Sequence, residues 1–554
     1  MKFETHNLDL WQKDIRSALD EIQRVNFSGR LLRKDHSLWQ EQDREISSRL
    51  GWLDSPLRMN RLLQDYRHQA EKIRSAGTDL LILLGMGGSS LAPEAISQII
   101  GSRPGWPRLL MLDSTSPGAV QAVAEAALAK DCRPLFLVSS KSGTTAETLS
   151  LLNYFYSRQI EIRGPQAGKN FVAITDPGTP LEKLAGELGF SLTVNGFPDI
   201  GGRFSALSPF GLFPAALMGL DLDKFLAPAS GSYQQLRRGE PVHPGLVLGS
   251  ILGVMFRAGR DKLTLLLPSP LRSLGRWLEQ LVAESTGKEG KGILPILENL
   301  PVSEDSYGLD RLLIFYELES QPDIFWQDRL EKLKASGQPV IQISLAREEL
   351  AAHFYLWELA TAVAGYFLGI NPFDQPDVEL TKKKTRELLA SGTPSSTESG
   401  LLSADRELLA AQLKSYFEDK NFRPGYLALL CFLAPGGNLD IALDNLARQF
   451  SEKFHLPCLW NYGPAYLHST GQLFKGDAGR GKFLGLIDDD PVDLAIPSLP
   501  GSPALAGSFK QLFMAQALAD FAALKQKGRE IMSLRFVGHP VETIFSLGEI
   551  IRKI

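Results

Sequence analysis

Hydroxyl side chains gather in residues 140–145 (SKSGTT), between two segments of different composition. The apolar run 135–138 before them predicts a short buried strand, and residues 146–152 after them have the composition of a helix. The first backbone N–H groups of a helix lack partners within it, and its dipole favours an anion there. Hydroxyls add donors, and Gly143 lets the backbone approach a ligand closely. The loop therefore predicts a phosphate site; the alternative is an ordinary strand-to-helix turn rich in Ser and Thr.

A second glycine-rich loop favours the phosphate site over that alternative. Residues 85–91 (GMGGSSL) follow the apolar run 80–84, and Ser90 occupies the third glycine position of a dinucleotide-binding fingerprint, so this is not that motif. Loops at the carboxyl ends of parallel strands converge on one crevice. We therefore expect Gly88 and Ser89 to line the same pocket as residues 140–145.

Two further clusters carry residue types suited to catalysis. Residues 199–205 (DIGGRFS) present Arg203, a permanent cation that suits an anionic ligand or transition state. Gln280 and Glu284 are four residues apart, so they share one face of a helix that is expected to end near Gly287. A carboxylate at that position is suited to act as a general base.

Each of these residues also has a structural interpretation when it is taken alone. Arg203 would be an arginine in a surface loop, and Glu284 a solvated helix residue. Lys382 lies on a helix expected to begin around Pro376, and a single helical lysine is normally solvated.

Short apolar runs alternate with stretches of helical composition along the chain. The runs span residues 80–84, 109–112, 135–138, 171–174, 192–194, 263–267, 312–316 and 340–343. Buried strands that alternate with helices indicate parallel sheets covered on both faces, so the sequence predicts an α/β fold with two domains of similar type. The expected parts are a helical N-terminal segment (1–60), a first domain (61–220), a second domain (221–389), a Ser/Thr/Gly/Pro-rich linker (390–403) and a C-terminal extension (404–554).

The composition narrows the classes of function. A net charge of −4 gives no basic field, so we expect no nucleic-acid partner. The sequence has neither an apolar run of membrane-spanning length nor a signal peptide at its start, so we expect no membrane partner. Three widely spaced cysteines, an odd number, suit a reducing cytoplasm. The eight histidines lack a paired ligand spacing such as H-E-x-x-H, so we expect no metal.

The motifs resemble those of one family, and in the same order. GMGGSSLAP, SKSGTT, GGRFSALSPFG, ESTGK and FDQPDVELTK span residues 85–382, over half of the chain, and are similar to the motifs of glucose-6-phosphate isomerases. Residues 463–473 resemble the C-terminal portion of isomerases that are fused to transaldolase. The transaldolase part itself has no counterpart in this sequence. The resemblance implies two sugar-isomerase (SIS-type) domains, interconversion of glucose 6-phosphate and fructose 6-phosphate, no cofactor, and a homodimer with the active site near its interface.

The resemblance also implies how the sugar phosphate, the small-molecule partner, is bound. Residues of the hydroxyl loop would hold the phosphate: Ser140, Lys141, Ser142 and Thr145. Gly88 and Ser89 would lie at the sugar.

By the same resemblance, Glu284 is the base that moves a proton between carbons 1 and 2 through a cis-enediol. Gln280 and Arg203 would orient the substrate and stabilise the negative charge of the intermediate, and Lys382 is associated with ring opening. An aldose–ketose shift needs such a base, a donor for the developing oxyanion and a remote handle, which the phosphate provides.

Three departures from the family bear on ring opening. In the interval where the family has its ring-opening histidine, this chain has only His353, inside an apolar helix where we expect a structural role. Phe474 stands where the fusion-type relatives have a second histidine, and Asp377 where the family usually has Gly. Besides Lys382, His468 is a candidate for opening the ring. Its motif (HSTGQLFKGD) resembles that of the fusion-type relatives, and histidine suits proton transfer near neutral pH. Hydrogen bonding within its own loop is the alternative role.

Other functions stay open on the sequence alone. Residues 476–482 fit the spacing G-x-x-x-x-G-K, but Phe483 replaces the Mg²⁺-binding hydroxyl residue, so nucleotide hydrolysis is not expected. SIS domains also serve as regulatory modules, so a non-catalytic sugar-phosphate sensor is one alternative; the catalytic residues favour the enzyme, since a sensor needs only the phosphate loops. An isomerase of relaxed specificity that also accepts mannose 6-phosphate is another.

Overall fold

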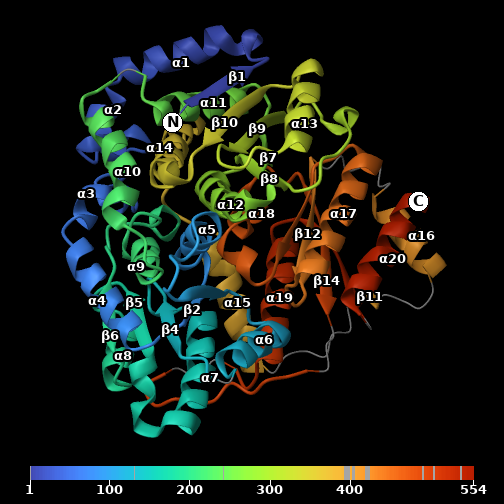
Figure 1. Ribbon diagram of the computed structural model, residues 1–554. Helices are drawn as coiled ribbons and strands as arrows, with labels where there is room; N and C mark the ends of the chain where they lie inside the picture. The colour runs from blue at the N-terminus through green and yellow to red at the C-terminus, as the bar shows by residue number, and fades with distance from the viewer. Residues whose placement is uncertain are drawn as a thin grey trace.

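The computed structural model describes residues 2–129, 131–240, 242–391, 400–401, 406–417, 425–488, 492–502, 506–536 and 539–554. These residues form three five-stranded sheets, and each sheet is packed among helices (Figure 1). We call each sheet with its helices a unit, numbered in the order of their parallel strands. All eight predicted apolar runs form strands, and the prediction of two parallel sheets flanked by helices is confirmed.

The first unit is an all-parallel sheet in the order β3-β2-β4-β5-β6. Its strands are β2 (Leu80–Gly85), β3 (Arg108–Leu112), β4 (Pro134–Ser139), β5 (Phe171–Thr175) and β6 (Leu192–Asn195). Its helices are α4 (Leu63–Ser75), α5 (Leu91–Ile99), α6 (Pro117–Ala127), α7 (Ala146–Arg163), α8 (Pro180–Glu187) and α9 (Pro209–Leu217). Strands β2 and β4 are fully buried, as expected for central parallel strands.

The second unit has the order β1-β10-β9-β7-β8, with β1 antiparallel to its neighbour. Its strands are β7 (Lys262–Leu266), β8 (Leu294–Glu298), β9 (Arg311–Leu318), β10 (Val340–Leu345) and β1 (Lys2–His6). Its helices are α1 (Gln12–Arg24), α2 (Phe27–Leu32), α3 (Ser55–Met59), α10 (Leu222–Arg237), α11 (Pro244–Arg257), α12 (Arg272–Thr286), α13 (Ile324–Ala335) and α14 (Leu350–Leu368). The two edge strands were not predicted, because β1 is mostly polar and β8 contains Pro295, which only an edge strand tolerates well.

The C-terminal extension forms a third parallel sheet, which the sequence analysis did not predict. Its order is β11-β15-β14-β12-β13, with β11 (Gly400–Leu401), β12 (Tyr426–Phe432), β13 (Cys458–Tyr462), β14 (Gly481–Asp488) and β15 (Glu530–Phe536). Its helices are α15 (Val378–Ser391), α16 (Arg406–Phe417), α17 (Gly437–Phe454), α18 (Gly471–Gly476), α19 (Phe509–Gln526) and α20 (Pro540–Lys553). Four strands of each sheet repeat one pattern: β3-β2-β4-β5, β8-β7-β9-β10 and β13-β12-β14-β15. The extension is therefore an α/β unit of the same topology.

Two other predicted segments have clear outcomes. Of the expected linker, residues 392–399 and 402–403 lie outside the described residues, whereas residues 390–391 end α15 and residues 400–401 form β11. Residues 476–482 lead from α18 into β14, so a helix precedes a strand. This is the reverse of the strand-to-helix order of a nucleotide-binding P-loop.

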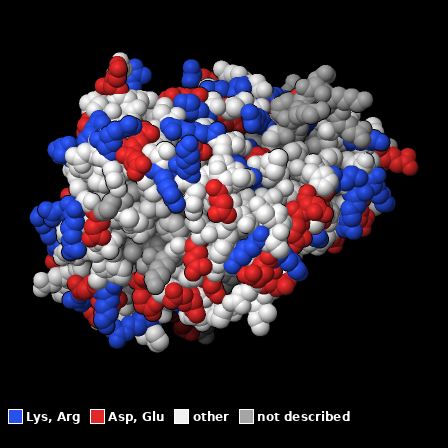
Figure 2. Space-filling view, turned by 90° about the horizontal axis from the view of Figure 1, so that it is seen from above, with Lys and Arg blue, Asp and Glu red and all other residues white. Residues whose placement is uncertain are grey.

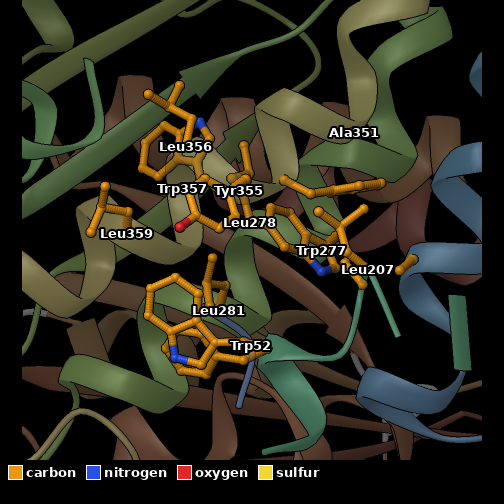
Figure 3. Close-up of a cluster of buried hydrophobic side chains, with 14 of the residues drawn as sticks. Trp52, Leu207, Trp277, Leu278, Leu281, Ala351, Tyr355, Leu356, Trp357 and Leu359 are labelled. Atoms are coloured by element: carbon orange, nitrogen blue, oxygen red, sulfur yellow. The ribbon is translucent and has the colours of Figure 1, made fainter. Parts of the chain in front are cut away.

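The core of the second unit surrounds α12. Figure 3 shows Trp277, Leu278 and Leu281 of this helix among side chains of α14, with Trp52 from the N-terminal segment nearby. Trp277 packs edge-on against Phe354, with ring centroids 4.7 Å apart. Every residue from 277 to 286 is buried, including several polar ones. Those polar side chains must therefore find partners inside the protein.

The surface carries both signs of charge. Figure 2 shows Lys and Arg intermingled with Asp and Glu over the face in view. Among the described residues, no helix is both long and apolar enough to cross a membrane. Cys132, Cys431 and Cys458 are free thiols.

A buried ion pair joins α18 to α19 in the third unit. Lys475 Nζ lies 2.6 Å from Asp520 Oδ1, and both side chains are almost fully buried. The Tyr466 hydroxyl donates to Asp520 Oδ2 at 2.7 Å, and the Thr381 hydroxyl of α15 donates to Oδ1 at 3.3 Å. The carboxylate therefore holds α15, α18 and α19 together.

Substituting Asp520→Asn should lower the free energy of unfolding by about 3–5 kcal/mol, because Lys475 keeps a buried charge without its partner. Urea titration followed by circular dichroism measures the change. Asp328→Asn is the matched control, since it removes the partner of Lys332 in an exposed pair and should change stability by less than about 1 kcal/mol. Equal small effects of the two substitutions would contradict the assigned role of the buried pair.

Candidate active site

A buried carboxylate lies near the end of α12. Glu284 Oε1 accepts from Arg203 Nη1 at 3.0 Å, and its Oε2 accepts from Gln280 Nε2 at 3.2 Å. The helix ends at Thr286 with Gly287 as its C-cap, as the sequence predicts, and Gln280 and Glu284 do share one face. All three side chains are buried, so the carboxylate and the guanidinium face each other away from bulk water.

The Arg203 guanidinium binds several elements at once. It lies in a short 3₁₀ turn, residues 202–204, and its Nε donates to Ser285 Oγ at 2.7 Å. Its Nη2 donates to the carbonyls of Pro372 and Asp374 at 2.7 and 3.0 Å. Its Nη1 also reaches Gln375 Oε1 at 3.5 Å. The cation is therefore fixed between α12 and residues 372–375.

The loop that holds Gly88 and Ser89 packs against the turn that holds Arg203. A Cβ atom on Gly88 would lie 2.0 Å from the carbonyl oxygen of Gly202, so only glycine fits there. The Ser205 hydroxyl donates to the Gly88 carbonyl at 3.2 Å. On the other side, the Ser139 hydroxyl donates to the carbonyl of the buried Ser89 at 3.2 Å. The Gly88–Ser89 loop thus lies between the Arg203 turn and the end of β4, which leads into the hydroxyl loop. That both loops line one pocket stays a prediction.

The hydroxyl loop, residues 140–145, leads directly into α7. Ser140 Oγ and Thr145 Oγ1 are 2.9 Å apart. The exposed Ser142 accepts from the Thr144 amide at 3.3 Å and from the Thr144 hydroxyl at 3.0 Å. Thr145 is the N-cap of α7, and its hydroxyl contacts Ser140 rather than the first N–H groups of the helix. Hydroxyls and helix N–H donors at one place form a geometry that suits an anion.

Lys141 is held differently from its neighbours. Its ammonium forms an ion pair with Asp176 and donates to the Phe197 carbonyl at 3.0 Å. Burial lowers the pKa of Lys141, and the contact with Asp176 opposes that shift. The side chain therefore ties the loop to β5 and residue 197, with its charge next to a carboxylate.

His468 lies beside the carboxylate of Glu147, a residue that the sequence analysis did not single out. The imidazole Nε2 is 3.0 Å from Glu147 Oε1, and Glu147 belongs to the first turn of α7. The backbone carbonyl of His468 accepts from Gln280 Nε2 at 2.7 Å. One signal was available in the sequence, because Glu147 follows the hydroxyl loop by two residues, but its partner is 321 residues away.

These contacts form a continuous polar line. It runs from the start of α7 through Glu147, His468 and Gln280 to Glu284 and Arg203. The hydroxyl loop comes from the first unit, the Glu284 carboxylate from the second and the histidine from the third. All of these groups belong to one chain.

Lys382 lies on α15, exposed to solvent, one turn beyond the start of the helix. Its neighbour Thr381 contacts Asp520 of α19. Its predicted role in ring opening stays a prediction.

The structure explains the departures at Phe474 and Asp377. Phe474 is buried in an aromatic cluster with Tyr426, Tyr466 and Phe483, so it belongs to the core of the third unit. The carboxylate of Asp377 accepts from Gln472 at 2.9 Å and pairs with Lys527 at 2.5 Å. An aspartate at this position therefore attaches the start of α15 to the third unit.

His353 has a structural position, as the sequence analysis expected. It is fully buried in α14, and its Nε2 lies 2.9 Å from the Tyr316 hydroxyl. Burial lowers the pKa of His353 to about 3, so the ring is neutral at physiological pH.

Lys288, just beyond α12, binds the same segment as Arg203. Its Nζ donates to the carbonyls of Asn371 and Asp374 at 2.8 and 2.6 Å and pairs with Asp374 Oδ1 at 2.8 Å. Burial and the nearby charge of Arg203 lower the pKa of Lys288 to about 8. Two cations thus hold residues 371–375 against the end of α12.

Metal ligands do not cluster in the part of the chain that the structure describes: three His, Cys, Asp or Glu side chains able to hold one ion do not come together there.

The chain is similar in sequence to phosphoglucose isomerases, which are also named glucose-6-phosphate isomerases. The sequence profile of the phosphoglucose isomerase family matches residues 55–293. The glucose-6-phosphate isomerase of Rubrobacter xylanophilus is 28% identical over 422 residues, which is 65% of this chain and 97% of that protein. That of Bacillus cereus is 28% identical over 404 residues, 61% of this chain and 86% of that protein. The crystal structure of a hypothetical protein from Thermus thermophilus has a TM-score of 0.57 and 25% identity, covering 70% of this chain and all of that one.

Replacing Lys288 with Met should change how stability depends on pH. The pKa of Lys288 is about 8 in the folded protein, against 10.5 for an ordinary lysine. Between pH 8 and pH 10.5 this lysine is therefore protonated in the unfolded chain and mostly neutral in the folded protein. Stability therefore rises with pH across this window, by up to about 3 kcal/mol from this group. Urea titrations at several pH values should show wild type gaining stability relative to Lys288→Met from pH 8 to 10.5. Parallel curves would contradict the prediction; Lys13→Met, at an exposed position, controls for the lost charge.

Proposed function

The chain belongs to the glucose-6-phosphate isomerase family, and from that premise we propose that it interconverts glucose 6-phosphate and fructose 6-phosphate. The observation that carries the proposal is the continuous polar line from Glu147, two residues after the hydroxyl loop, to the paired Glu284 and Arg203. An aldose–ketose shift on a phosphorylated sugar requires a site for the phosphate, a group that opens the ring and a base for carbons 1 and 2. The hydroxyl loop, His468 and Glu284 are suited to these three tasks.

The phosphate acts as the remote handle. The hydroxyls of Ser140, Ser142 and Thr145 and the N–H groups at the start of α7 supply its donors. Lys141 adds a positive charge close by, although its ammonium is shared with Asp176. Fixing the phosphate at this end leaves carbons 1 and 2 of the open chain free to reach α12.

Glu284 transfers the proton. For the open-chain aldose, its carboxylate takes the proton from carbon 2, and the electrons of that C–H bond form the double bond between carbons 1 and 2. The carbonyl oxygen on carbon 1 takes up the negative charge, which Arg203 offsets. The proton on oxygen 2 then passes to oxygen 1. Glu284 delivers its proton to carbon 1, whose new C–H bond takes the electrons of the double bond, while the negative oxygen 2 becomes the carbonyl oxygen of the ketose.

Gln280 orients the sugar between these groups. Its Nε2 donates to Glu284 and to the His468 carbonyl, whereas its buried Oε1 accepts no hydrogen bond from the described part of the chain. That oxygen is available to a sugar hydroxyl. Gly88 and Ser89, beside the Arg203 turn, line the sugar from the other side.

His468 opens the sugar ring. Its imidazole is partly exposed and lies between the hydroxyl loop and Gln280, so it can move a proton between the ring oxygen and the anomeric hydroxyl. Glu147 orients the ring through its contact with Nε2. Lys382 is the alternative for this step.

The proposal also covers the compartment and the oligomeric state of the protein. Free thiols suit a reducing compartment, so we propose a cytoplasmic protein. The family resemblance supports a homodimer.

The coupled assay for fructose 6-phosphate formation, without added metal, tests the function. Wild type should be active, and Glu284→Gln should lower turnover by roughly 10²–10⁴, the usual contribution of a positioned base. Glu125→Gln, an exposed glutamate on α6, is the control and should be fully active. Binding of the sugar phosphate without turnover by wild type would favour the sensor instead. Supplying mannose 6-phosphate in parallel measures how strictly the site selects its sugar.

The role of His468 is tested with two substrates. His468→Ala should lose most activity on cyclic glucose 6-phosphate but keep most proton exchange on an open-chain analogue such as 5-deoxyfructose 6-phosphate, which lacks the ring-forming hydroxyl. Exchange of the carbon-1 proton with solvent is followed by NMR. His68→Ala, on the exposed face of α4, is the control. Equal losses on both substrates, or none, would remove His468 from the mechanism and leave Lys382.

A further inference from the structure

Two side chains of the third unit converge on one oxygen of Glu147. His468 Nε2 lies 3.0 Å from Oε1, and Gln516 Nε2 donates to the same atom at 2.6 Å. Gln516 belongs to α19, and both it and Glu147 are buried. A carboxylate oxygen that receives two donors in a dry environment has a fixed direction.

The orientation of the Gln516 amide is itself fixed. The Glu147 carboxylate can only accept, so the NH₂ group of Gln516 must face it, which leaves Gln516 Oε1 to accept from the Thr115 hydroxyl at 2.9 Å. Thr115 follows β3 in the first unit and is fully buried. A flipped amide would direct its oxygen at the carboxylate and lose the hydrogen bond to Glu147. The amide therefore links the first and third units in one defined arrangement.

Two acidic groups of the first unit, Glu147 and Asp113, interact with the imidazole. Burial alone would raise the pKa of Glu147, but the charge and hydrogen bond of His468, together with the Gln516 amide, hold it below its usual range. Asp113, which is half-buried, faces His468 from the end of β3. Arg276 of α12 offsets the charge of Asp113 and pairs with Glu94 of α5.

We propose that Gln516 is a positioning residue for His468, acting through Glu147. It directs the carboxylate so that the neutral imidazole carries its proton on Nε2 and keeps Nδ1 as the nitrogen that exchanges a proton with the sugar. The ring-opening half of the site is thus assembled by the third unit, which brings both the histidine and the amide that orients its partner. The expected effect on ring opening rests on the proposed function, whereas the expected tautomer of His468 does not.

The structural consequence is tested without any substrate. In ¹⁵N-histidine-labelled protein, NMR at a pH where the ring is neutral should show His468 as the Nε2–H tautomer, identified by its absence in His468→Ala. Gln516→Leu should shift His468 towards a mixture of tautomers, whereas Gln526→Leu, an exposed glutamine on the same helix, should not. An unchanged tautomer in folded Gln516→Leu would overturn the proposal.

The catalytic consequence separates a positioning role from a merely structural one. Gln516→Leu should lower turnover on cyclic glucose 6-phosphate by about 10–100-fold, the effect of losing a hydrogen bond to a charged group, and leave exchange on the open-chain analogue within about threefold. Adding it to His468→Ala should cause little further loss, because the amide acts only through the histidine. Equal losses on both substrates would overturn the proposal.

A second variant keeps the test decisive if Gln516→Leu does not fold. Thr115→Val removes the hydroxyl that fixes the amide while keeping the side-chain volume, and it should show the same pattern more weakly. No effect of Thr115→Val on either the tautomer or the cyclic substrate would count against the proposal. A wild type without isomerase activity would contradict the proposed function, but it would leave the tautomer measurement, and therefore this inference, open to its own test.

Discussion

The ion pair between Glu284 and Arg203 is the interaction on which the centre of the molecule depends. Burying two charges is unfavourable unless they are paired and their remaining hydrogen-bonding groups are satisfied. Gln280 and Ser285 supply partners from α12, and the carbonyls of residues 372 and 374 supply the rest. Because these partners belong to different segments, satisfying one guanidinium fixes how the Arg203 turn, α12 and residues 372–375 lie relative to one another.

The third unit is joined to this centre by close backbone packing. A Cβ on Gly287 would lie 2.3 Å from Leu473 Cα, and one on Gly476 would lie 2.4 Å from the Gly287 carbonyl. Gln472 donates to that same carbonyl at 3.0 Å and to Asp377 at 2.9 Å. The glycines let α18 approach the end of α12, and this approach brings His468, three residues before α18, against Gln280.

The proposed catalytic groups come from all three units. The proposed phosphate loop and the carboxylate partner of the histidine come from the first unit, the proposed base and its helix from the second, and the histidine from the third. A reaction at carbons 1 and 2 of a sugar held by its distal phosphate needs groups several ångströms apart with fixed directions. Rigid α/β units that meet at loops and helix ends provide such directions, because each group lies next to a well-packed element.

The sequence by itself determined the local elements and the chemical types of the site. Apolar runs of three to five residues predicted eight of the strands, and the spacing of Gln280 and Glu284 placed them on one helical face. Local patterns are sufficient there because burial and helical periodicity act over a few residues. Only the tertiary structure decided the partners of His468, since Glu147 is 321 residues away and no local pattern encodes such a distance. It likewise decided that Phe474 fills an aromatic core, and that the C-terminal segment forms a third sheet, because parallel strands pair through long-range contacts that no local run of residues specifies.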